Sequence, residues 1–255
     1  VDKFRNFSTT NEDGSMRSKT WFKAVPDELF DAKNSENQDD KELWYYADAR
    51  GKLAYSEIKT INGRKYAFND KGAMLTGLWY LTVDSSNKIA SGSNATVELD
   101  SESKLNEYTK LSATAATFAR PSSSDPKSGL YYFGDESDGS MKTGKQSVEL
   151  DGEKLTFEFE KNGSNKGAGI IGMDDHKFYI GGKLAMAGND NKIEVVVLDS
   201  DNKLISKQSV EDALITYGDG GKQVKKSNGD LDYTEFKLTK LPNKAKAYVV
   251  NTTGA

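Results

Sequence analysis

The sequence predicts a mainly β fold, built as an elongated, solenoid-like stack of β-hairpin repeats with one or two short helices in the inserts. Three observations lead to this prediction. Aromatic strand-like runs alternate with tight-turn signals about every 8–12 residues, one such phrase occurs twice, and only 36% of the 255 residues are hydrophobic. So low a hydrophobic fraction suits hairpins that each bury one face against their neighbours, rather than a single deep core.

The first clear unit runs from residue 44 to residue 77. Strand-like runs at 44–46 and 65–68 are separated by turn signals at Arg50-Gly51 and Asn62-Gly63, and a further turn follows at 69–72. Asn-Gly between apolar runs is a strong hairpin signal, because a type I′ turn requires positive φ at both central residues. The unit is therefore predicted to contain two hairpins in series.

The second unit repeats the first at a nearly constant distance. Tyr131 follows Trp44 by 87 residues, and Asp151-Gly152 follows Asn62-Gly63 by 89. In the strand after that turn, Leu155, Phe157 and Phe159 alternate with polar residues, which is typical of a strand with one buried face. An imperfect internal repeat of aromatic hairpins is the main feature of the chain.

The repeats and the stretches between them divide the chain into four parts. Residues 1–25 are predicted to be a partial hairpin repeat, 26–121 the first repeat lobe with a helical insert, 129–192 the second repeat lobe, and 193–255 a β-rich region. This last region ends in a turn-like phrase that reads as cut off within a repeat, so we expect the natural protein to continue.

Two short helices are expected in the inserts. Pro26 is followed by acidic residues, which suits a first helical turn over about 26–32. Leu105, Tyr108 and Leu111 recur at helical spacing and predict a helix over about 102–112.

Composition and charge exclude several function classes. The net charge of −4 gives no electrostatic support for binding nucleic acid. There is no cysteine, and therefore no disulfide or thiolate metal site. No apolar run reaches the ~20 residues that a membrane-spanning helix needs. No signal peptide is present, and the first residue, Val1, indicates a mature or trimmed chain.

Few residues could carry catalysis or bind a metal or cofactor. The single histidine, His176, lies in a charged turn without a recognisable nucleophile. Asp199 opens a calcium-like loop that lacks the required Gly and Glu. The glycine-rich stretch 163–172 lacks the Lys-Ser/Thr ending of a phosphate loop. The acidic run 36–40 reads as a solvated loop or, alternatively, a cation site. We therefore predict no catalytic residue, no metal ligand and no cofactor.

The aromatic hairpins resemble the cell-wall-binding repeats, also called choline- or glucan-binding repeats, of Gram-positive surface proteins. The resemblance rests on WYYAD (44–48), INGRKYAFNDKGAMLTG (61–77) and YYFGDESDGSMKTG (131–144), and more weakly on DGSMRS (13–18) and the hairpin at 178–185. These matches cover about a third of the chain. The Gly-Trp step of the family pattern is interrupted here, since Gly77 is followed by Leu78 before Trp79.

The resemblance implies a secreted, non-catalytic module at the cell wall or cell surface, whose partner is a cell wall polysaccharide or a teichoic acid bearing choline. Rings at the hairpin seams would stack on a sugar or enclose a quaternary ammonium. Because the Gly-Trp step is interrupted, a glycan is favoured over choline. The expected ligand-binding residues are Trp44, Tyr46, Tyr66, Trp79, Tyr131 and Phe133.

Three alternatives stay open. The rings could all belong to the core, the repeats could form an adhesion or spacer scaffold that contacts a protein partner, and the chain could act on glycans as an enzyme.

Overall fold

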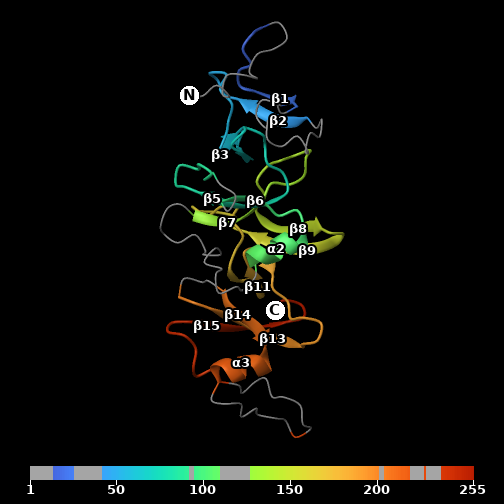
Figure 1. Ribbon diagram of the computed structural model, residues 1–255, viewed down its shortest axis with the longest axis vertical. Coiled ribbons are helices and arrows are strands. Elements are labelled where there is room, and N and C mark those ends of the chain that lie inside the picture. Colours follow the sequence, from blue (N-terminus) through green and yellow to red (C-terminus); the bar gives the residue numbers. More distant parts are fainter. Residues whose placement is uncertain are drawn as a thin grey trace, which may run out of the picture. The chain divides into compact units, whose positions relative to one another are not determined.

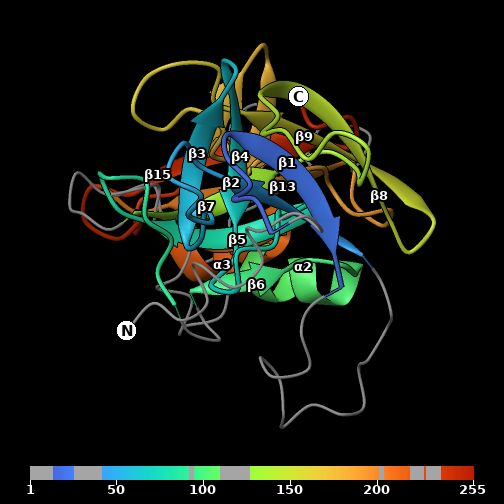
Figure 2. The same cartoon turned by 90° about the horizontal axis from the view of Figure 1, so that it is seen from above.

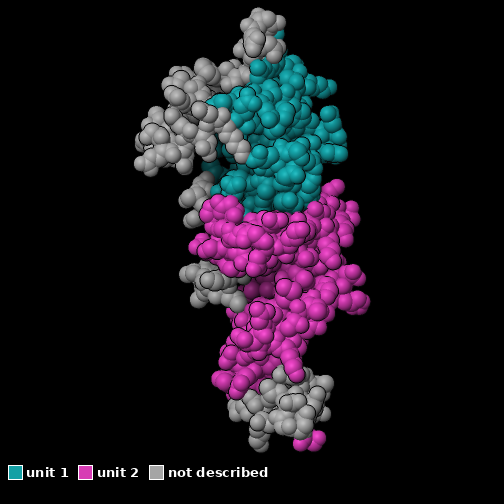
Figure 3. Space-filling view, turned by 90° about the vertical axis from the view of Figure 1, so that its right-hand side faces the viewer, with its two compact units in different colours: residues 1–99, 131–142 teal, residues 100–130, 143–255 magenta. Residues whose placement is uncertain are grey.

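The protein consists mainly of β-strands arranged in several small antiparallel sheets (Figure 1). The structure is a computed structural model that describes residues 14–25, 42–91, 95–109, 127–200, 204–218, 227 and 237–255. The chain divides into two compact units, coloured separately in Figure 3. Unit 1 comprises residues 1–99 and 131–142, and unit 2 comprises residues 100–130 and 143–255. The prediction of a mainly β fold is confirmed, whereas stacking into an elongated solenoid stays a prediction.

Unit 1 is built from short antiparallel pairs. Strand β1 pairs with β2, β3 with β4 and β5 with β6. A third strand, β7, whose last two residues belong to unit 1, joins the sheet of β5 and β6. Figure 2 shows β3 and β4 side by side. The bounds are β1 (Thr20–Ala24), β2 (Leu43–Ala47), β3 (Glu57–Ile61), β4 (Arg64–Phe68), β5 (Leu78–Val83), β6 (Thr96–Glu98) and β7 (Lys127–Tyr132).

The predicted two-residue turns have the expected backbone conformation. Asn62 and Gly63 have φ of 50° and 80°, and they join β3 to β4. Asp151 and Gly152 have φ of 51° and 82° and join the corresponding strands of the second repeat. Both central residues of each turn have positive φ, as a type I′ hairpin requires. The hairpin predictions at these two sites are confirmed.

A second turn type recurs at the ends of strands. Asp48 closes β2, and its carboxylate accepts hydrogen bonds from the backbone N–H groups of residues 50 and 52, at 2.8 and 2.9 Å. The amide oxygen of Asn69 accepts the same two bonds after β4, from residues 71 and 73. Asp84 and Asn251 make the same pair of bonds. Such Asx turns fold the chain back without a partner strand, so the repeat seen in the sequence is also a repeat of hydrogen bonds.

Unit 2 contains two sheets. Its five-stranded sheet has the order β10-β11-β12-β9-β8, and its three-stranded sheet has the order β14-β13-β15. The bounds are β8 (Gly144–Leu150), β9 (Glu153–Phe159), β10 (Gly172–Asp174), β11 (Lys177–Ile180), β12 (Lys183–Leu184), β13 (Ile193–Leu198), β14 (Leu204–Ser209) and β15 (Lys246–Asn251).

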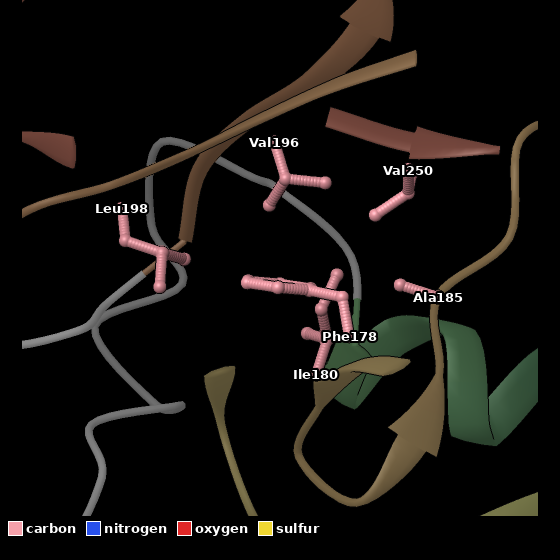
Figure 4. Packing of buried hydrophobic residues seen from close by; sticks show 6 residues of the cluster. All are labelled: Phe178, Ile180, Ala185, Val196, Leu198 and Val250. Carbon is pink, nitrogen blue, oxygen red and sulfur yellow. The ribbon is translucent and has the colours of Figure 1, made fainter. Parts of the chain in front are cut away.

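One apolar cluster joins the two sheets of unit 2. Phe178 and Ile180 of β11 lie against Val196 and Leu198 of β13 and Val250 of β15 (Figure 4). Phe178 is fully buried, and so are Val196 and Val250. Alternate residues of β13 point to the opposite face, where they pack against a helix. The middle strand β13 is therefore covered on both faces, which accounts for its continuous apolar run.

Two helices lie among the described residues. Helix α2 (Glu102–Thr109) confirms the helix predicted from the spacing of Leu105 and its neighbours, although residues 110–112 fall outside the described part. Helix α3 (Val210–Tyr217) was not predicted. Its N-cap is Ser209, whose hydroxyl accepts a hydrogen bond from the backbone N–H of Asp212 at 3.1 Å.

Two sequence-based expectations fall on residues outside the described part of the chain. They are the helix over 26–32 and the acidic run 36–40.

Candidate ligand-binding site

Three aromatic rings of unit 1 line one cavity of about 250 Å³. Trp21 comes from β1, Trp44 from β2 and Tyr66 from β4, and each ring is partly exposed. Met74 adds its thioether to the wall. The mouth of the cavity is formed by residues 136–138. The cavity therefore combines ring faces from two hairpins with an acidic rim.

Strand register brings the rings together. Trp21 lies opposite Tyr46 in the β1–β2 pair, and Lys23 lies opposite Trp44, so all four side chains share one face. The Trp21 ring contacts Tyr46 edge-on at 5.2 Å and Tyr66 at 4.8 Å between centroids. It also stacks on Phe68 at 5.8 Å. Three neighbouring rings thus hold the Trp21 side chain in place, so it loses little conformational entropy when a ligand binds.

Met74 is held in the cavity wall by its backbone and by a neighbouring turn. Its N–H donates to the carbonyl of Trp44 at 2.8 Å, and it forms a bridge with Phe68. Gly139 passes so close that a Cβ there would overlap the Met74 side chain. A side chain there would force the end of the Met74 side chain to move, and φ of 60° at Gly139 also favours glycine. The same turn brings Glu136 and Asp138 to the rim.

The charge on the rim is negative but partly balanced. Asp138 contacts the ammonium of Lys142 and lies 3.4 Å from the Arg64 guanidinium. The hydrogen bond from Lys142 holds the pKa of Asp138 below its ordinary value, against the opposing effect of burial. Glu136 is exposed at the same mouth. The rim therefore carries two carboxylates, of which that of Asp138 is held in its ionised form.

A smaller cavity of about 80 Å³ adjoins Trp44, and Trp44, Met74 and Glu136 line both cavities. The Lys23 ammonium lies 5.1 Å from the centroid of the Trp44 ring. This distance is within the range of a cation–π interaction. The Trp44 ring therefore already attracts one cation of the protein itself.

Only two of the six predicted ligand-binding residues line the aromatic cavity, namely Trp44 and Tyr66. Tyr46 shares the face but is only 8% exposed, since Trp21 covers it. Trp79 lies in β5, where its indole N–H donates to the carbonyl of Thr76 at 2.7 Å.

The remaining two, Tyr131 and Phe133, stack on each other at 6.3 Å between centroids. Tyr131 is 6% exposed and Phe133 is fully buried. Burial raises the pKa of Tyr131 to about 12.

The sequence analysis missed Trp21 and Met74. Trp21 follows DGSMRS, the weakest of the matching phrases, and its place after that phrase was the available signal. Met74 lies within the MLTG ending of a clear match. Both residues join the site through contacts between hairpins, which residue spacing within one hairpin does not reveal.

The described residues offer little for metal binding or membrane insertion. Within them, no group of three or more His, Cys, Asp or Glu side chains is placed to hold a metal ion. None of the described helices is long and apolar enough to cross a membrane. His176 forms part of the two-residue turn between β10 and β11, with φ of 60°.

The chain was compared with known families, curated proteins and solved structures. No family model matches it, and no curated protein does. Among solved structures, it is similar to choline binding protein F from Streptococcus pneumoniae, crystallised in the presence of a peptidoglycan analogue. Identity is 20%, the match covers 91% of this chain and 53% of that one, and the TM-score is 0.34. The chain thus spans about half the length of that protein.

Two further similar structures have comparable scores. The choline-binding domain of CbpL from Streptococcus pneumoniae is 18% identical, with 88% of this chain and 81% of that chain covered and a TM-score of 0.32. The pneumococcal cell wall endolysin from phage Cp-1, complexed with choline, is 15% identical, with 78% and 37% covered and a TM-score of 0.24. Because these values are low, the role of each residue has to come from its own contacts. The solved structures that this chain resembles are choline-binding and cell-wall-binding proteins.

Proposed function

We propose that unit 1 belongs to a non-catalytic module that binds a quaternary ammonium group, such as choline, carried by a polymer of the bacterial cell wall. The observation that carries this proposal is the convergence of Trp21, Trp44 and Tyr66 on one cavity with carboxylates at its mouth. A trimethylammonium group has no N–H to donate, so aromatic faces and nearby negative charge are the main means of holding it.

The added ring of Trp21 favours a quaternary ammonium over a sugar. A sugar can stack on one or two flat faces but needs hydrogen-bond partners around its edge. Here the lining consists of three aromatic residues, Met74 and residues 136–138, which supply two carboxylates.

Binding at one such cavity is expected to be weak, in the millimolar range, and to gain strength when several sites engage one polymer. A module of this kind would hold a secreted protein at the cell wall, for example through choline-bearing teichoic acid. The alternative, a spacer that contacts only protein, predicts no response to any of these small ligands.

The proposal is tested by titrating choline while following tryptophan emission. All three tryptophans of the chain, Trp21, Trp44 and Trp79, lie in unit 1. We expect choline to change the emission, whereas 3,3-dimethylbutan-1-ol, its uncharged analogue of the same shape, should have much less effect. N-acetylglucosamine provides the sugar arm. A response to the sugar alone would show that the cavity is a glycan site and would overturn the choline assignment.

Matched variants locate the site. Trp44→Ala should weaken choline binding by roughly 3- to 30-fold, the equivalent of one cation–π contact. Trp79→Phe is the control, because Trp79 does not line either cavity beside Trp44. Glu136→Gln should weaken binding modestly, and more at low salt than at high salt. If Trp79→Phe abolished binding while Trp44→Ala did not, the aromatic cavity would not be the site.

A further inference from the structure

A separate cavity of about 290 Å³ lies wholly within unit 2. Its walls come from helix α2, from the β11–β12 hairpin with the segment that follows it, and from the edge strand β14. Its size is close to the lower limit of small-molecule sites, which begin near 300 Å³. The lining residues are Asn106, Ile180, Lys183, Leu184, Ala185, Met186, Ala187 and Lys207.

The floor of this cavity is apolar and is held in place by the chain around it. The N–H of Ala185 donates to the carbonyl of Phe178 at 2.8 Å, and the N–H of Ala187 donates to that of Asn251 at 2.9 Å. Gly254 lies so close that a Cβ there would be 2.6 Å from Leu184 Cδ1. Contacts with β15 and with the turn that follows it therefore hold the floor in place, as expected for a preformed site.

Two lysines supply positive charge to the walls. The Lys183 and Lys207 side chains are 25% and 26% exposed, so each is largely enclosed. Lys183 lies 3.9 Å from a carboxylate oxygen of Glu102, and Lys207 contacts the carboxylate of Glu194. Neither glutamate lines the cavity.

The pairing of the lysines with Glu102 and Glu194 leaves part of each ammonium's hydrogen-bonding capacity unused. Each ammonium has three N–H donors, and the pairing with one carboxylate uses only part of them. Glu194 also accepts a hydrogen bond from the side-chain amide of Asn191 at 3.1 Å, which holds the carboxylate in position behind Lys207. Asn106 on helix α2 adds an amide that can both donate and accept.

We propose that this cavity binds a small carboxylate that carries an apolar acyl or methyl group, of the size of an N-acetylated amino acid or an N-acetylated sugar acid. The carboxylate would bond to the ammoniums of Lys183 and Lys207, since charge-assisted hydrogen bonds are the strongest available there. The methyl group would cover the floor at Ala185 and Ala187, and the amide would bond to Asn106. This site is independent of the aromatic cavity and does not depend on the choline proposal.

The test uses the full chain and follows backbone and methyl NMR signals during titration. N-acetyl-alanine and N-acetylmuramic acid represent the two sources of the carboxylate. Their uncharged partners, N-acetyl-alaninamide and N-acetylglucosamine, keep the acetamido group but lack the acid. We expect either acid to shift the signals of Ala185, Ala187 and Asn106, with the uncharged partner at least tenfold weaker. Equal binding of acid and uncharged partner, or no shift at these residues at millimolar concentrations, would overturn the proposal.

Substitutions then separate the site from general effects of charge. Lys183→Gln should weaken binding of the acid roughly tenfold, and its loose pairing with Glu102 means that folding is retained. Lys161→Gln is the matched control, because Lys161 pairs with the buried Glu158 at 3.0 Å but does not line the cavity.

Ala187→Leu, which fills the cavity, should abolish binding without affecting the choline response of unit 1. Unchanged binding in both Lys183→Gln and Ala187→Leu would place the ligand elsewhere and refute the assignment.

Discussion

Phe157→Ala is the sharpest test of the hairpin arrangement in unit 2. Phe157 lies in β9, between Gln146 of β8 and Lys183 of β12, in the interior of the five-stranded sheet. Its side chain is fully buried, and its ring stacks on Phe159 at 5.9 Å with an interplanar angle of 7°. The substitution would remove a complete ring from a packed face and leave a cavity.

The expected loss of unfolding free energy is about 3–5 kcal/mol, the range for Phe→Ala in a core. Up to about 1 kcal/mol of this would come from the lost ring pair. Phe157→Leu should cost less, and Lys154→Ala, at an exposed position of the same strand, should change stability by less than about 0.5 kcal/mol.

Hydrogen exchange of peptides from β8 and β9 in urea is the appropriate assay, because every tryptophan lies in unit 1 and tryptophan emission reports on that unit. A loss below about 1 kcal/mol in this exchange experiment would mean that Phe157 does not face the core.

Three further predictions concern backbone packing and charge. Gly169→Ala should destabilise unit 2 by about 2 kcal/mol or more, because a Cβ would overlap the carbonyl of Gly181; an unchanged urea midpoint would contradict this contact. Burial is the largest single effect and raises the pKa of Glu194, but the hydrogen bonds from Lys207 and Asn191 and the charge of Lys207 together outweigh it, so the pKa is lowered overall. The resulting stability is present above about pH 4.3, where unfolded Glu titrates, and is lost as pH falls further. Glu194→Gln should therefore flatten the acid limb of a thermal melt series, and an identical limb would exclude this role. Asp48→Ala should cost about 1–2 kcal/mol through two lost backbone hydrogen bonds, whereas Asp48→Asn should be nearly neutral in urea denaturation, and equal losses would refute the turn's contribution.

The hairpin turns were predictable because their signal is local. Asn62-Gly63 and Asp151-Gly152 are dipeptides that readily adopt positive φ at both residues. No distant contact is needed to place them. Helix α3 had a local signal too, since Ser209 precedes Asp212 at the spacing of a helix N-cap. Residues 193–255 were instead predicted to be a β-rich region, in which no helix was expected.

The aromatic site was only partly predictable, because strand periodicity does not say which ring stays open. Trp44 and Tyr46 share one face of β2, as period-2 geometry predicts. The ring of Trp21 from the paired strand covers Tyr46 and leaves Trp44 partly exposed. Which of these two rings stays exposed depends on the register between β1 and β2. Residues 26–41, which lie between these strands in the sequence, carry no turn signal that fixes this register.

Two copies of the repeat share a backbone hydrogen bond but differ in the side chain beside it. Met74 donates its N–H to the carbonyl of Trp44, and Met141 donates in the same way to the carbonyl of Lys65, both at 2.8 Å. The second copy therefore has a lysine where the first has a tryptophan. A lysine side chain has no aromatic face to offer a quaternary ammonium, whereas an indole has one. The two copies thus share this backbone hydrogen bond, while the aromatic face that the choline proposal requires is present only in the first of them.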